Sequence, residues 1–159
     1  MVRSEKTLIP FMALAGLMLL AGLWAGLVRL GWYLPQPGAG LTGAHGALMV
    51  GGFLGTLIGL ERVGAVKRWW AYGAPLFAAL GGLAVLGGLA AAAGGIFFLF
   101  GSLSLFAIFV ALVSRHRSAP LITMALGAAL WAAGNGLTGD DDERGSARNK
   151  LPRMDSPDR

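Results

Sequence analysis

Two side chains that can do chemistry, His45 and Met49, lie near the start of the second apolar segment. An imidazole nitrogen binds metal ions or haem iron, or it handles protons, and a thioether sulfur is a soft ligand that suits copper. Positions i and i+4 of a helix lie one above the other on the same face. His45 and Met49 are therefore the candidate cofactor-binding residues, with His45 as the candidate metal ligand. Because both project from one side of one helix, they cannot occupy opposite axial positions of a single haem.

The other reactive residues are few and scattered along the chain. There is no cysteine, which excludes thiolate metal sites and a cysteine nucleophile. Glu61 is the only acid between Lys6 and Gly139, so the apolar part of the chain holds no pair of carboxylates for acid–base catalysis. The second histidine, His116, stands in a basic loop. We predict no catalytic residue and do not expect an enzyme.

The elements that must position His45 are predicted to be membrane-spanning helices. Apolar residues make up 55% of the chain and charged residues 13%, a composition typical of proteins that lie in a lipid bilayer. A spanning helix needs about 20 predominantly apolar residues. We predict an all-α integral membrane bundle of five helices, at residues 8–30, 42–60, 72–92, 96–114 and 119–138. The first run is too long for a signal peptide, whose apolar part has about 7–15 residues.

The positions of the basic residues predict the orientation of this bundle in the membrane. Short cytoplasmic loops carry an excess of lysine and arginine. Basic residues precede the first span and follow the second and the fourth: Arg3, Lys6, Arg62, Lys67, Arg68, Arg115 and Arg117. We expect a multi-pass protein of the cell (inner) membrane with a cytoplasmic N-terminus. The net charge of +5 is then a topology signal, and we expect no nucleic-acid partner, because the cations are spread among short loops.

The residues after the fifth span change sharply in composition. Residues 139–159 begin with a run of acids from Asp140 to Glu143 and contain almost no apolar side chains. Segments of this composition cannot bury enough apolar surface to fold. We predict a disordered hydrophilic tail on the outer side of the membrane. The alternative is that a longer membrane domain is cut short here.

Helical spacing predicts which way the second span faces. At about 100° per residue, the small and polar residues form one stripe, made of His45, Met49, Gly52, Thr56 and Gly59. Bulky apolar residues form the opposite face, made of Val50, Leu54, Leu57 and Ile58. Packed faces in membranes favour small residues, so we expect His45 to point into the protein. Gly51, Gly55 and Gly59 have a close-approach spacing, for which Gly22 and Gly26 of the first span are the expected counterpart.

Other polar residues in or near the spans are assigned structural roles. Glu61 and Arg62 are interpreted as interfacial charges that stop the second helix. Adjacent helical residues do not face one another, so we expect no simple ion pair between them. Asn135 in the fifth span is expected to hydrogen-bond to another helix.

An inward histidine near the end of a span has three interpretations. It is a hydrogen-bonded packing residue, a proton-handling group, or a metal or haem ligand. The residues alone leave these open for His45. A methionine at helical spacing, such as Met49, also fills space in apolar cores.

The string Ala44-His45-Gly46-Ala47-Leu48-Met49 resembles two known helix patterns. It is similar to the second helix of haem-copper oxidase subunit I, where an A-H-G-x-x-M type string supplies an axial ligand to the low-spin haem. It also looks like the NnrS-like family of polytopic bacterial membrane proteins, linked to haem, copper and nitric oxide stress. The resemblance covers about a tenth of the chain and implies that His45 is a haem or copper ligand.

The chain departs from the oxidase pattern in its histidines. An oxidase needs a second axial ligand and further histidines for its binuclear centre, and here His116 is predicted to lie on the opposite side of the membrane. Three sources for the missing ligand remain. In the first, a homodimer holds one haem between the His45 residues of its two subunits. In the second, a methionine of another span is the second axial ligand. In the third, the chain is the front part of a longer family pattern that contains the missing ligand.

Three hypotheses for function follow. The first is a haem- or copper-binding membrane protein related to nitric oxide or respiratory stress. The second is a non-enzymatic helical bundle, a homo-oligomer or a subunit with a membrane partner, in which His45 only packs. The third is a component of a small-solute transporter, for which a buried ionisable residue is the indicator, and only His45 qualifies.

Overall fold

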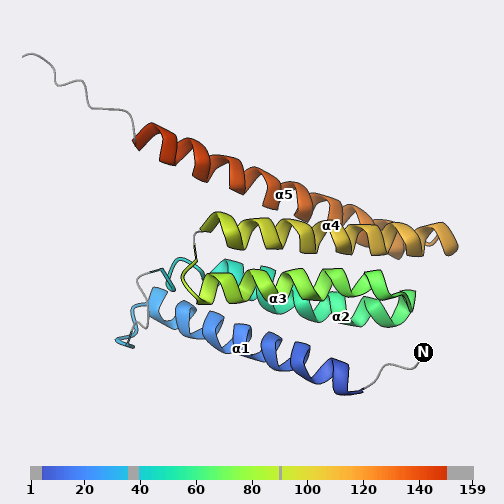
Figure 1. The fold of residues 1–159 in the computed structure, drawn as a ribbon, viewed down its shortest axis with the longest axis horizontal. Coiled ribbons are helices and arrows are strands. Elements are labelled where there is room, and N and C mark those ends of the chain that lie inside the picture. The colour runs from blue at the N-terminus through green and yellow to red at the C-terminus, as the bar shows by residue number, and fades with distance from the viewer. Residues whose placement is uncertain (1–4, 36–39, 90, 150–159) are drawn as a thin grey trace, which may run out of the picture.

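The computed structural model describes residues 5–35, 40–89 and 91–149, and the side chains of residues 7–35, 40–89 and 92–137. All of the regular structure in these residues is helical (Figure 1). Helix α1 spans Glu5–Arg29. A π-helical segment, η1, spans Ala47–Leu54 and continues into α2, Gly55–Val66. A short 3-10 helix, η2, spans Trp69–Tyr72 and leads into α3, Gly73–Leu86. Helices α4 and α5 span Ala91–Arg115 and Ala119–Asn149.

Five of these helical stretches are long and apolar enough to cross a membrane. They are α1, η1 with α2, η2 with α3, α4, and α5. The predicted all-helical class and the number of candidate spans are therefore confirmed for the described residues.

The second helix ends later than predicted. The expected span was 42–60, but α2 runs through Glu61 and Arg62 to Val66. Lys67 then ends the helix in the left-handed conformation, with φ 55° and ψ 34°. Its backbone N–H donates to the Val63 carbonyl, which satisfies one of the carbonyls left open at a helix end. The charges at 61 and 62 therefore do not stop the helix; the backbone turn at Lys67 does.

The third and fifth helices also differ from their predicted ranges. Helix α3 ends at Leu86, and the chain turns at Gly88, whose φ of 68° suits glycine.

The predicted disordered tail begins at Gly139, yet α5 continues to Asn149. Extending an existing helix needs no new nucleus, so the polar residues 139–149 prolong it. Residues 150–159 of the predicted tail, with Arg3 and Ala90, lie outside the described residues.

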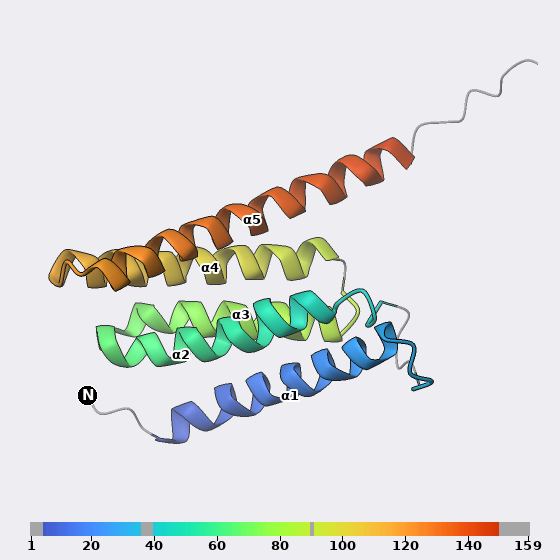
Figure 2. The same cartoon turned by 180° about the vertical axis from the view of Figure 1, so that it is seen from behind.

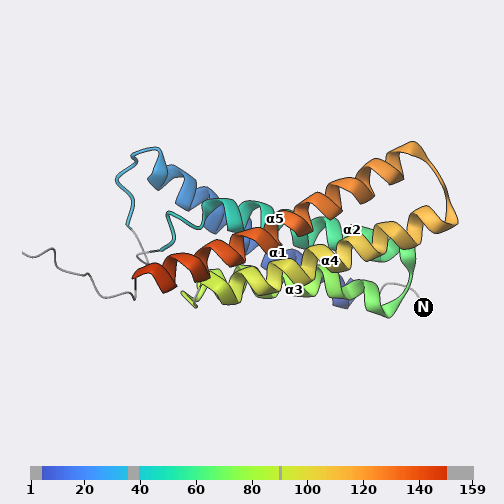
Figure 3. The same cartoon turned by 90° about the horizontal axis from the view of Figure 1, so that it is seen from above.

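The helices run alternately in opposite directions and form layers. Helices α2 and α3 lie between α1 on one side and α4 on the other, and α5 covers α4 (Figures 1 and 2). Seen from above, α5 crosses obliquely over the helices beneath it (Figure 3). Its apolar span has the smallest buried share of the five, 11%, against 44% for η1 with α2.

The predicted basic loops lie at one end of the bundle. The N-terminal end of α1, the turn from α2 to η2 and the loop from α4 to α5 share that end (Figure 1). Arg62, Lys67, Arg68, Arg115 and Arg117 belong to it. Arg29, at the other end of α1, lies on the opposite side. The alternation of charge that was read from the sequence therefore corresponds to the two ends of the bundle.

Large side chains fill notches left by glycines. Met18 of α1 lies between Gly52 of η1 and Gly82 of α3; a Cβ atom on Gly82 would be 2.6 Å from the Met18 sulfur. The Phe98 ring of α4 is held in the same way between Gly51 and Gly81. Small residues thus let the middle layer contact both of its neighbours.

The side of the second span predicted to face lipid is largely exposed. Val50, Leu54 and Leu57 are 48%, 40% and 41% exposed. Ile58, placed on that side by the helical spacing, instead packs against the buried cluster around Val63. Three of the four predicted outward residues are therefore at the bundle surface.

Candidate functional site

His45 is tied to the first helix by a hydrogen bond. Its Nδ1 atom lies 2.7 Å from the Gly22 carbonyl oxygen of α1. A carbonyl only accepts, so Nδ1 carries the proton and donates it. This bond fixes the tautomer and the orientation of the imidazole, and His45 points into the protein as predicted.

Helix α1 provides notches for both predicted site residues. A Cβ atom on Gly26 would lie 2.9 Å from His45 Cε1 and 3.0 Å from Nδ1. A Cβ atom on Gly22 would lie 2.7 Å from the Met49 sulfur. Distances this short leave no room for a side chain at either glycine. Gly22 therefore receives Met49 and Gly26 receives His45, whereas the predicted counterparts Gly51 and Gly59 contact α4 and α3 respectively.

The second ring nitrogen of His45, Nε2, has no hydrogen-bond partner among the described residues. It is not one of their enclosed polar atoms. In a neutral imidazole with the proton on Nδ1, Nε2 holds a lone pair. Metal-bound histidines usually donate their other N–H to a carbonyl or carboxylate, which fixes the ring and raises its basicity. His45 has this arrangement before any ligand is added.

The small and polar residues of the second span contact different helices along its length, on either side of and within the π-helical segment. His45 and Met49 face α1, Gly52 meets both α1 and α3, and Gly59 lies against Pro75 of α3. A π-helix bonds residue i to i+5, so each residue turns through a smaller angle than in an α-helix. The predicted stripe, calculated with α-helical spacing, is buried or half-buried throughout, but it turns from one neighbour to another. π-helical segments are frequent at functional sites.

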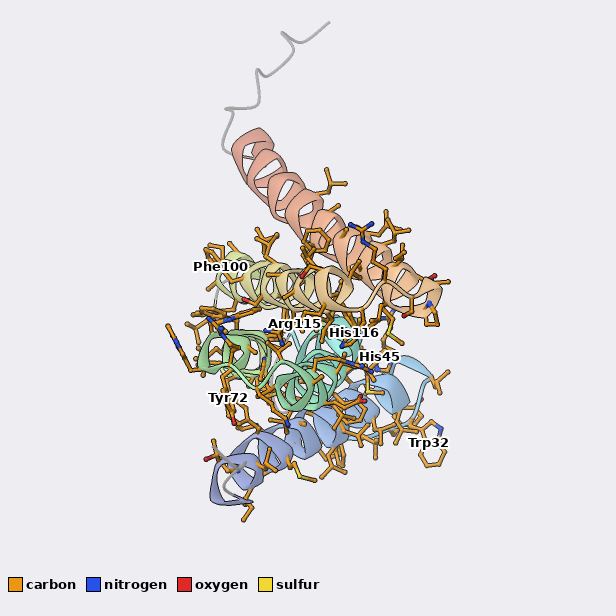
Figure 4. All side chains as sticks on the ribbon, turned by 90° about the vertical axis from the view of Figure 1, so that its right-hand side faces the viewer. Trp32, His45, Tyr72, Phe100, Arg115 and His116 are labelled. Carbon is orange, nitrogen blue, oxygen red and sulfur yellow. The ribbon has the colours of Figure 1, made fainter. Side chains whose placement is uncertain are left out.

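His45 does not belong to a larger cluster of histidine and acidic side chains in the described residues. Those residues contain no group of three or more histidine, aspartate or glutamate side chains that could hold a metal ion. His116 is exposed in the loop after α4, at the opposite end from His45. The two appear close together in Figure 4 only because that view looks along the bundle. Any haem or copper bound at His45 would therefore need ligands other than a cluster of described histidine, aspartate or glutamate side chains.

Thr56 adds an unsatisfied hydroxyl to the buried stripe. It is fully buried, and its Oγ1 atom has no hydrogen-bond partner among the described residues. Thr56 lies just after the π-helical segment, where the hydrogen-bond pattern returns to α-helical. A buried hydroxyl without a hydrogen-bond partner lowers the stability of the fold. Thr56 is therefore a destabilising polar position in the middle of the bundle.

Two further polar contacts were only partly expected. The Asn135 amide of α5 donates to the Phe98 carbonyl at 3.2 Å and contacts the Ser102 hydroxyl at 3.1 Å, both on α4. This confirms the predicted hydrogen bond from Asn135 to another helix. Ser102 was missed, because a serine among apolar residues gives no sign of its partner.

The prediction for Glu61 and Arg62 was wrong. The Arg62 Nη2 atom lies 3.2 Å from the Glu61 carboxylate, so the two residues do form an ion pair. Their Cβ atoms diverge on the helix, but the arginine side chain is long enough to return to its neighbour. The Arg62 guanidinium carbon also lies 5.7 Å from the centre of the Phe109 ring of α4, a distance at which a cation is attracted to a ring.

Comparison with known protein families assigns this chain. Residues 8–143 match the model of a family described as a domain of unknown function (DUF8744), and the chain belongs to that family. The match covers all five candidate spans through Leu137. No curated protein and no solved structure matches the chain.

Proposed function

We propose that this member of the DUF8744 family is an integral membrane protein in which His45 supplies one ligand to haem or copper. The observation that carries the proposal is the state of the imidazole: Nδ1 donates to the Gly22 carbonyl, and Nε2 remains accessible with its lone pair. The short string around His45 that resembles known haem-binding helices gives the same assignment.

Membrane insertion is the premise of this proposal. Five apolar helices and a surface with many exposed large apolar residues support it. The basic loops at one end support a cytoplasmic N-terminus in the inner membrane, which puts His45 near the outer surface. Both points can be tested by carbonate extraction and by accessibility tags on each terminus.

The remaining ligands are proposed to come from a second subunit. The His45 ring is closely held by α1 on the side of Cε1 and Nδ1, so a ligand reaches Nε2 from the edge of the bundle. A second copy of the chain, or a partner membrane subunit, can present its own ligand there. Haem or copper held in this way supplies one-electron redox chemistry or binds a small gas. Met49 stays a predicted ligand, although its sulfur lies against Gly22, where it fills space.

The test is a purification in mild detergent from haem-replete, copper-supplemented cells. We expect a Soret band or stoichiometric copper in the wild-type protein, lost in His45→Ala and retained in His116→Ala. The second variant removes the exposed histidine at the other end and controls for adventitious binding. A colourless, metal-free wild-type protein would contradict the proposal.

A second candidate function is favoured by the α1 notches. Gly22 and Gly26 fit Met49 and His45 so closely that packing alone can account for both residues. In that case the protein is a non-enzymatic helical bundle or partner subunit. His45→Ala then lowers stability and changes nothing else. The transporter hypothesis stays a prediction that rests on His45 alone.

A further inference from the structure

The basic end of the bundle combines five cations from the C-terminal ends of α2 and α4 and the segments that follow them. We use this name for Arg62, Lys67, Arg68, Arg115 and Arg117, which lie on α2, the turn after it, and the end of α4 with its following loop. Helices α2 and α4 pack against each other, so the two loops are neighbours. Figure 4 looks onto this end and labels Arg115 and His116 there.

Most of this charge is not neutralised by the described residues. Lys67, Arg68, Arg115 and Arg117 are exposed, and none forms an ion pair with a described residue. Glu61 is the only acid whose side chain is described, and Arg62 already contacts it. The basic end therefore presents a positive surface.

Arg62 brings an unsatisfied donor to the contact between α2 and α4, near the basic end. Its Nε atom is buried and has no hydrogen-bond partner among the described residues. Its guanidinium lies over Phe109 of α4, so it is held between the helix that precedes one loop and the helix that precedes the other. A buried donor without a hydrogen bond is costly. An oxyanion bound near Arg62 would supply an acceptor for it.

An apolar stripe runs away from the basic end along α5. Ile122, Leu126 and Leu130 follow one another at every fourth residue and are 45%, 61% and 74% exposed. The stripe begins just after Arg117. Trp69, 86% exposed beside Lys67 and Arg68, adds an aromatic side chain of the kind found at membrane interfaces. A phospholipid combines the same two features, a charged headgroup at one end and long apolar chains.

We propose that the basic end binds the headgroup of an anionic phospholipid, whose acyl chain lies along Ile122, Leu126 and Leu130. The proposal rests on the membrane insertion proposed above but does not depend on haem or copper. Guanidinium groups form paired hydrogen bonds with phosphate oxygens, and each basic residue near an anionic surface strengthens binding about fivefold.

The experiment counts bound lipids by native mass spectrometry on the purified, delipidated protein in an uncharged detergent. Phosphatidylglycerol and phosphatidylcholine with identical acyl chains are titrated separately. We expect phosphatidylglycerol to bind at least about tenfold more tightly, with this preference lost in about 0.5 M salt, where charges are screened. The double variant Arg115→Gln/Arg117→Gln should weaken binding about 25-fold, because two cations are removed.

Two controls separate the site from general attraction. Arg29→Gln removes an exposed cation at the opposite end and should change phosphatidylglycerol binding less than about twofold. Glycerol phosphate, which has the anion but no acyl chain, should bind much more weakly than the lipid. The proposal would be overturned if the two lipids bound equally, or if the double variant bound phosphatidylglycerol as tightly as the wild type. It would also be overturned if Arg29→Gln weakened phosphatidylglycerol binding as much as the double variant does. Glycerol phosphate binding as tightly as the lipid would overturn the role of the apolar stripe.

The outcome remains decisive if the double variant does not fold. The salt dependence of the wild-type protein then serves as the test, and a preference for phosphatidylglycerol that survives high salt overturns the proposal. The same titration on His45→Ala should match the wild type. A failure here therefore leaves the His45 proposal standing, and a failure at His45 leaves this one standing.

Discussion

Helices α1 and α5 lie on opposite sides of the bundle (Figure 1), and each is joined to its neighbour by a hydrogen bond from a side-chain nitrogen to a backbone carbonyl. The carbonyl belongs to α1 in the first case and to α4 in the second. On the α1 side, His45 Nδ1 donates to the Gly22 carbonyl at 2.7 Å. On the α5 side, Asn135 Nδ2 contacts the Phe98 carbonyl and the Ser102 hydroxyl at 3.2 and 3.1 Å. Both contacts supply polar partners where lipid offers none.

The two attachments differ in what they leave unused. The Asn135 amide nitrogen has two N–H groups, and both have partners on α4. The His45 ring uses one nitrogen for attachment and keeps the other accessible. A contact of the first kind only holds helices together, whereas one of the second kind can also bind a ligand. This difference is why the candidate site is placed at α1 and not at α5.

The largest effect is expected from Gly26→Val, which removes the notch for the imidazole. The added side chain meets His45 within 3.0 Å, and overpacking of this kind costs about 1–3 kcal/mol. The measurement is the free energy of unfolding by SDS titration in mixed micelles. Because the ring must move, haem or copper should also be lost. Gly16→Val on the same helix is the matched control, since nothing lies within 4 Å of its Cβ position.

A smaller effect is expected from Asn135→Leu. Interhelical hydrogen bonds in membranes contribute about 0.6–1.7 kcal/mol, and the Ser102 hydroxyl keeps its own bond to the Leu99 carbonyl. The same titration should show a loss in that range, with the visible spectrum and copper content unchanged. Loss of haem or copper in this variant would break the comparison, because it would give the α5 attachment a role in ligand binding.

The smallest effect on stability is expected from His45→Asn. The asparagine amide can take the place of Nδ1 and donate to the Gly22 carbonyl, so the loss should stay below about 0.6 kcal/mol. His45→Ala, which removes the bond, should lose more. Equal losses in the two variants would show that the hydrogen bond contributes nothing and that only ring volume matters.

The sequence predicted the parts of this structure that depend on local composition. Apolar runs identified the five spans, and basic residues identified the end of the bundle to which their loops belong. The inward direction of His45 followed from the small residues on its side of the helix. Each of these signals is contained within one segment.

The remaining features depend on contacts between segments or on backbone geometry. A π-helix has no composition of its own, so the turn of the buried stripe from α1 to α3 was not foreseen. The glycine pairing was wrong because Gly22 receives a thioether and Gly26 an imidazole, and spacing alone does not specify which side chain packs against a glycine. Helix α2 ends where Lys67 adopts the left-handed backbone conformation. Arg62 forms its ion pair with Glu61 because its side chain is long enough to reach back to its neighbour.

The central claim is that His45 holds α1 with one nitrogen and offers the other to haem or copper. Its most direct test is the visible spectrum and copper content of wild type and His45→Asn, purified together from haem-replete, copper-supplemented cells. We expect haem or stoichiometric copper in the wild-type protein and neither in His45→Asn, whose stability should be nearly unchanged. Equal haem or copper in both proteins, or none in the wild type, would contradict it.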